Sequence, residues 1–148
     1  MNTEDRWIIV SLILSFSGVV SAALLKNPSP IGISVFIIIG LLFVVYLHTR
    51  SERLAWLLIF GVVAGFGELF ADWIHVEYFH SLVYLNYFGF KLLASPLYMP
   101  FGWWLSVVQF GYLTMRIAER WRNSAAIAIM TVLGMLLPPW YEQFAAPA

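Results

Sequence analysis

The sequence predicts an all-α protein: a polytopic bundle of about five transmembrane helices that forms one integral-membrane domain over residues 1–148. Three observations predict this fold. Five predominantly apolar stretches follow one another, each long enough for a helix that crosses a hydrocarbon core of about 30 Å. Apolar residues make up 61% of the chain and charged residues 11%, a composition that water would not solvate. No stretch alternates apolar and polar residues over the roughly ten positions that a barrel strand needs.

The predicted spans cover residues 7–25, 31–47, 54–71, 97–115 and 124–141, and the fifth is the weakest. The first follows an acidic start and is long enough to span, which favours a membrane helix over a cleavable signal peptide. Ahead of the second, Ser29 is predicted to cap a helix that starts on Pro30. The third alone has an acidic residue in its interior, Glu68.

The fourth and fifth spans have prolines near their ends. Ser95 and Pro96 are predicted to be the cap and first position of the fourth helix, with Pro100 delaying its start or bending it. Pro138 is predicted to interrupt the fifth, because proline removes a backbone hydrogen bond. If the fifth does not cross fully, there are four spans. The connection of residues 72–95 is rich in aromatic rings and is predicted to lie in the membrane interface.

The basic residues predict the orientation of the bundle. With five spans, six basic residues fall on one side of the membrane and two on the other. Loops rich in Lys and Arg stay in the cytoplasm. The chain is therefore expected in the cell membrane with its N-terminus cytoplasmic, so that residues 72–95 lie on the outer face. The six are Arg6, Arg50, Arg53, Arg116, Arg120 and Arg122, and the two are Lys26 and Lys91.

The overall charge and the cysteine count exclude several classes of function. Eight basic and eight acidic residues cancel, which argues against a nucleic-acid partner. The chain has no cysteine, so disulfides, thiolate chemistry and Cys-ligated metal sites are excluded.

One helix face carries the residues that could do chemistry. Glu68, Asp72 and His75 are spaced i, i+4 and i+7, so they share one stripe of the third helix. An acidic residue inside a membrane is unfavourable by about 2.5–3.5 kcal/mol, so Glu68 is expected to face protein or a watery cavity. We predict these three as catalytic residues, with Glu68 as a proton donor or acceptor. The alternative is a structural Glu68 that is hydrogen-bonded to another helix.

The same face raises the question of a metal. A di-iron helix bundle needs two Glu-x-x-His helices, and the other spans offer no second pair. No metal and no cofactor are predicted. A single mononuclear site built from Glu68, Asp72, His75 and His80 is the alternative.

A substrate cavity is expected between the third and fourth spans. Gln109 and Tyr112 lie on a polar stripe of the fourth, and Tyr98 and Trp103 lie near its outer end. Glu142 follows the fifth span and is expected at the same outer interface. For Gln109 the alternative is a structural hydrogen bond across helices.

Small residues predict one close helix contact. Gly61-x-x-x-Gly65 lets another backbone approach the third span, and the small face of the first span, which includes Ser11, Ser15 and Gly18, is its expected partner. Homodimerisation through these glycines is the alternative.

These features predict an integral-membrane protein that handles a lipid or isoprenoid in an outer-leaflet cavity, with Glu68 transferring a proton. Its expected ligand is a membrane lipid or an apolar small molecule. Two other functions stay open: a non-catalytic subunit of a larger membrane complex, and a small proton-coupled transporter. Whether the protein is an enzyme is left open as well.

Overall fold

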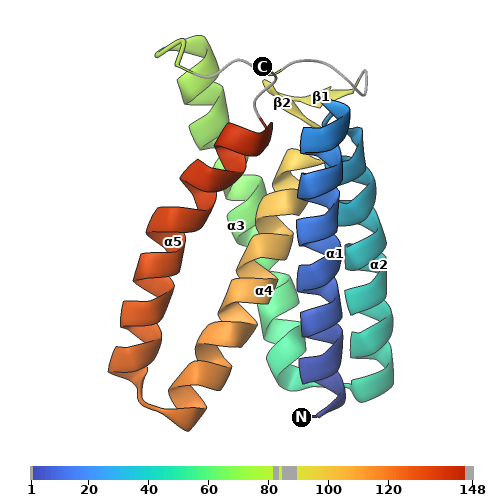
Figure 1. The fold of residues 1–148 in the computed structure, drawn as a ribbon, viewed down its shortest axis with the longest axis vertical. Helices are drawn as coiled ribbons and strands as arrows, with labels where there is room; N and C mark the ends of the chain where they lie inside the picture. Colours follow the sequence, from blue (N-terminus) through green and yellow to red (C-terminus); the bar gives the residue numbers. More distant parts are fainter. Residues whose placement is uncertain (1, 82–83, 85–89, 146–148) are drawn as a thin grey trace.

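The structure is a bundle of five helices. The computed structural model describes residues 2–81, 84 and 90–145, with side chains up to Met135. Within these residues the helices are α1 (Thr3–Leu25), α2 (Ser29–Thr49), α3 (Glu52–Glu77), α4 (Met99–Arg120) and α5 (Asn123–Ala145) (Figure 1). A small antiparallel hairpin, β1 (Lys91–Leu92) and β2 (Ser95–Pro96), precedes α4. The all-α prediction is confirmed apart from this hairpin.

Three of the described helices, α1, α2 and α3, are long and apolar enough to cross a membrane. Their outward faces expose large apolar side chains, among them Leu24, Phe60 and Phe70, each more than three-fifths exposed. Exposed apolar surface on this scale is stable in lipid and unfavourable in water. The helices therefore indicate a membrane protein, as the sequence predicts.

Two predicted helix starts are wrong. Ser29 already belongs to α2, and its N–H donates to the Asn27 side chain at 2.9 Å, so Ser29 is not the cap. Ser95 and Pro96 form β2, and α4 begins only at Met99. Pro100 then lies in the first turn of α4, where a missing N–H costs no helical hydrogen bond.

Pro138 does not end the last helix. α5 continues to Ala145, past Pro138. Proline removes one hydrogen bond from a helix, yet membrane helices tolerate this where the freed carbonyl finds another partner.

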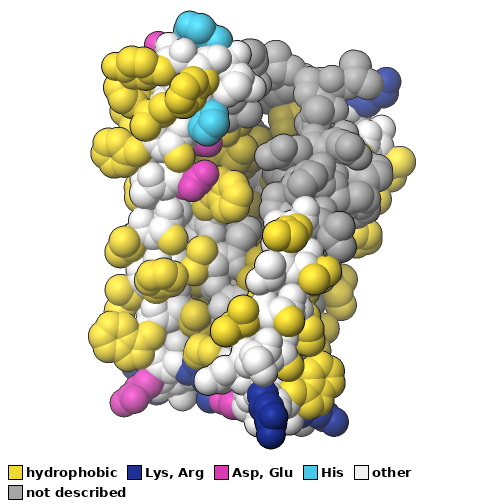
Figure 2. All heavy atoms as spheres, turned by 90° about the vertical axis from the view of Figure 1, so that its left-hand side faces the viewer, with side chains coloured by type: hydrophobic (Ala, Val, Ile, Leu, Met, Phe, Trp, Pro, Cys, Tyr) yellow, Lys and Arg dark blue, Asp and Glu magenta, His cyan; other side chains and the backbone are white. Residues whose placement is uncertain are grey.

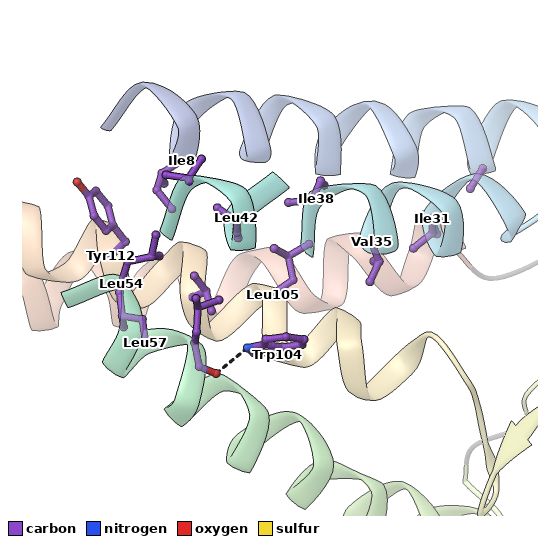
Figure 3. Packing of buried hydrophobic residues seen from close by; sticks show 14 residues of the cluster. Ile8, Ile31, Val35, Ile38, Leu42, Leu54, Leu57, Trp104, Leu105 and Tyr112 are labelled. Carbon is purple, nitrogen blue, oxygen red and sulfur yellow. Dashed lines mark hydrogen bonds between the residues drawn. The ribbon is translucent and has the colours of Figure 1, made fainter. Parts of the chain in front are cut away.

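The centre of the bundle is α4, which packs most extensively on α3 and also contacts α1, α2 and α5. Buried side chains from α1 to α4 meet there, including Ile8, Leu42, Leu54 and Leu105 (Figure 3). The buried indole of Trp104 needs a hydrogen-bond partner, and its Nε1–H donates to the Leu58 carbonyl oxygen at 2.8 Å.

The glycine pair on α3 makes a close helix contact, but with α4 rather than with α1. A Cβ atom on Gly61 would lie 2.2 Å from Trp104 Cδ1, and one on Gly65 would lie 2.2 Å from the Pro100 carbonyl oxygen. On the small face of α1, Gly18 instead meets α2, since a Cβ on Gly18 would lie 2.3 Å from Ser34 Oγ. The predicted pairing of the first and third spans is therefore wrong. Small residues show where a backbone can approach, but they do not select which helix approaches.

Candidate functional site

Asp72 lies near the end of α3 and is 6% exposed. Its Oδ2 atom accepts two hydrogen bonds, from the Tyr84 hydroxyl at 2.9 Å and from Ser95 Oγ at 2.7 Å. Burial, followed by the charge and hydrogen bond of the Asp72 carboxylate, raises the pKa of the Tyr84 hydroxyl. Tyr84 therefore stays a donor over the physiological pH range, and the carboxylate is held by two hydroxyl groups.

The hairpin between α3 and α4 brings Ser95 to this position. Leu93 adopts φ 54° in the turn that joins β1 to β2, and Lys91 pairs with Pro96 across the ladder. Ser95 is fully buried on β2 beside α3. Sequence reasoning missed both Ser95 and Tyr84 as partners of Asp72. The only indication in the sequence was that both residues carry a hydroxyl group and lie in the aromatic connection.

Glu68 lies one helical turn before Asp72 and is half-buried. It interacts electrostatically with Asp72 and His75. Among the described residues, neither a hydrogen bond nor an ion pair satisfies its carboxylate. Glu68 thus differs from Asp72, although both belong to one stripe of α3.

His75 is on the same stripe but is exposed at the helix end. Its Nδ1 atom is 2.9 Å from Ser81 Oγ, and its ring is tilted against Phe79. His80 lies beyond the helix, with Nδ1 3.0 Å from the Val76 carbonyl oxygen. In the described part of the chain, no group of three His, Cys, Asp or Glu side chains could hold a metal ion.

Glu68 lies on the flank of α3 that faces away from α2. On the α2 side, Phe66 packs against Phe101 of α4, which also contacts Phe36 of α2. Leu57 lies on the other flank against α4, and Glu68 follows it after eleven residues, about three helical turns. Within the described backbone, helix α5 packs on α4 and α1 rather than on α3. Figure 2 shows that face, with acidic and histidine side chains gathered over the upper part of α3.

The structure brings only some of the predicted cavity residues near Glu68 and Asp72. Tyr98 is the N-cap residue of α4 and interacts electrostatically with Tyr84. Trp103 is on the first turns of α4 and is 38% exposed. Glu142 belongs to α5, and its side chain lies outside the described part of the structure.

Gln109 is turned toward α1 instead. Its Nε2 atom donates to Ser11 Oγ and Ser15 Oγ, each at 3.0 Å, and it is buried. These contacts fit the structural alternative, a hydrogen bond across helices.

Tyr112 lies at the opposite end of the bundle. Its hydroxyl donates to Asp5 Oδ1 at 2.9 Å, and the Arg116 guanidinium contacts both Asp5 oxygens, with Nε at 2.9 Å and Nη2 at 3.0 Å. Arg116 and Arg53 both pair with Glu119. Tyr112 is therefore not brought to Glu68.

Comparison with known proteins supplies a family but no function. Residues 69–148 match a family described as a domain of unknown function (DUF6989), and because this is more than half of the chain, the chain belongs to that family. The matched region includes Asp72, Tyr84 and Ser95 and begins one residue after Glu68. No curated protein and no solved structure matches the chain.

Proposed function

We propose that the chain is a five-span protein of the cell membrane, with its N-terminus in the cytoplasm and the α3–α4 connection on the outer face. Helices α4 and α5 have 22 and 23 residues, about 33 and 35 Å at 1.5 Å per residue, so both are long enough to cross. A less apolar α4 is compatible with a span, because its neighbours cover it. The six basic residues against two support this orientation.

Cysteine labelling tests the orientation, since the chain has no cysteine of its own. Lys26 and Arg50 are matched sites: both are exposed C-cap residues with positive φ, at opposite ends of α2. We expect a membrane-impermeant maleimide to label Lys26→Cys in intact cells, and Arg50→Cys only after permeabilisation. The reverse pattern would contradict the orientation.

We further propose that the protein handles a lipid or isoprenoid in an outer-leaflet cavity beside α3, with Glu68 as proton donor or acceptor. One observation carries this proposal: Glu68 is half-buried on α3, with no counter-cation among the described Lys and Arg residues. A carboxyl group in such a setting exchanges a proton more readily than one held in an ion pair.

Each neighbouring residue has a role in this proposal. Asp72 and His75 tune the proton affinity of Glu68 through their charges. Trp103 and Tyr98 offer aromatic surface for an apolar ligand.

Mass spectrometry of molecules that copurify with the protein tests this function. We expect a lipid-sized molecule with the parent protein, and a changed amount or a changed chemical form with Glu68→Gln. Glu77→Gln is the matched control, because Glu77 is an exposed glutamate in the last turn of the same helix. The proposal fails if the parent and both variants carry the same lipids.

The same preparations distinguish the other two functions. A non-catalytic subunit would copurify with partner proteins and tolerate Glu68→Gln. A proton-coupled transporter would give Glu68-dependent proton movement in sealed vesicles, with access to the site from both sides of the membrane.

A further inference from the structure

Two hydroxyl groups in the α3–α4 connection have no role in the function proposed above. Tyr84 and Ser95 are 12 and 23 residues from Asp72 in sequence, yet both donate to the same Asp72 oxygen, Oδ2. The second oxygen, Oδ1, receives no hydrogen bond from the described residues. Ser95 is fully buried, so water cannot replace its contact with Asp72.

This geometry fixes the carboxyl group of Asp72. A carboxylate on a short side chain can rotate, and a single donor leaves much of that freedom. Two donors on one oxygen hold that oxygen in place and favour the carboxylate plane in which its two lone pairs face them. The negative charge is thereby held one helical turn from Glu68, the residue with which Asp72 interacts electrostatically.

We propose that Tyr84 and Ser95 are positioning residues of the Glu68 site, and that they act on Glu68 by holding the Asp72 carboxylate in place. This inference rests on the proposed function of Glu68 as a proton donor or acceptor. It makes the hairpin of β1 and β2 part of the site, because β2 carries Ser95. The competing view is that the two hydrogen bonds only tie the connection to α3.

Isotope-edited infrared spectroscopy separates these views, because Asp5 and Asp72 are the only two aspartates in the chain. The full-length protein, carrying aspartate labelled with ¹³C at the side-chain carboxyl, shows two shifted carboxyl signals, and Asp72→Asn identifies one of them. We expect Ser95→Ala and Tyr84→Phe to move the Asp72 signal and leave the Asp5 signal in place. Tyr112→Phe is the control that should move only Asp5, which accepts from Tyr112.

The second readout is the carbonyl band of protonated Glu68 at the same pH, identified by its loss in Glu68→Gln. We expect Ser95→Ala and Tyr84→Phe to shift this band in the direction that Asp72→Asn does. In an Asp72→Asn background the same two substitutions should leave the band unmoved, because they act through Asp72. Ser106→Ala removes a hydroxyl that bonds only within α4 and should leave both readouts unchanged.

Three results would contradict the inference alone, and a fourth would show failure of the proposed function. If neither substitution moves the Asp72 signal, the hydroxyls do not hold the carboxylate. If the Asp72 signal moves while the Glu68 band stays, or if the band moves equally without Asp72, they are not positioning residues for Glu68. If the parent shows no Glu68 band at any pH at which it is folded, the proton role fails, and this inference fails with it.

Discussion

The two aspartates of this chain lie at opposite ends of the bundle and share one feature. Asp5 accepts a hydrogen bond from Tyr112 at 2.9 Å, and Asp72 accepts one from Tyr84 at the same distance. Their other partners differ in charge. The Arg116 guanidinium contacts both oxygens of Asp5, whereas the second donor to Asp72 is the Ser95 hydroxyl.

This difference separates an acidic cluster that is paired with arginines from one that has no described Lys or Arg partner. At the Asp5 end, guanidinium groups also pair with the neighbouring acid, Glu119. An ion pair of this kind keeps a carboxylate charged and joins three helices. At the Asp72 end the neighbouring acid is Glu68, and no described Lys or Arg is paired with it. Proton exchange is favoured where charge is left uncompensated in an apolar setting.

The largest expected effect concerns the close contact between α3 and α4, the helices that run between the two ends of the bundle. Gly65→Ala should destabilise the protein by roughly 1–3 kcal/mol, because the new Cβ would collide with the Pro100 backbone. Gly67→Ala is the control on the same helix: its Cβ meets no atom within 4 Å, and alanine favours a helix. Thermal unfolding in detergent compares the two. Equal stability of both variants would remove the close α3–α4 contact.

Gln109 lies between the two ends and forms an uncharged polar cluster with Ser11 and Ser15. Substituting Gln109 tests whether this cluster is purely structural. Gln109→Leu keeps a similar size and removes the bonds to Ser11 and Ser15. We expect a loss of about 0.6–2 kcal/mol, typical of polar contacts between membrane helices, with the copurifying lipid unchanged. A change in that lipid at full stability would instead assign Gln109 to the ligand site.

Deleting each tyrosine hydroxyl compares the two ends most directly. Tyr112→Phe and Tyr84→Phe each remove one hydrogen bond to an aspartate, and each should lower stability by about 1 kcal/mol. Only Tyr84→Phe should also alter the lipid that copurifies with the protein. If Tyr112→Phe altered it as well, the Asp5 end would not be merely structural.

The smallest effect on stability is expected at the two glutamates. Glu119→Gln loses charge in two ion pairs and should lower the unfolding temperature slightly, since exposed pairs contribute little. Glu68→Gln loses no ion pair among the described residues and should leave that temperature unchanged or raised. A marked drop with Glu68→Gln would show a hidden structural partner and favour the structural alternative for Glu68.

The helices and the shared stripe of Glu68, Asp72 and His75 could be predicted from the sequence. Apolar runs of this length form helices, because lipid offers the backbone no hydrogen-bond partners. Glu68, Asp72 and His75 share a stripe because helical periodicity is a local property, readable from spacing alone. The approach of another backbone at Gly61 and Gly65 was predictable for the same local reason.

The partners that these residues meet depend on how the helices pack. It placed Trp104 over Gly61, Asp5 beside Tyr112, and the hydroxyls of Tyr84 and Ser95 on Asp72. Each of these contacts joins residues that are distant in sequence. Apolar helices carry little that distinguishes one neighbour from another, so their pairing follows from how all five pack together. The spacing of residues along a helix fixes the face on which a side chain lies, whereas the packing of the helices fixes what that side chain touches.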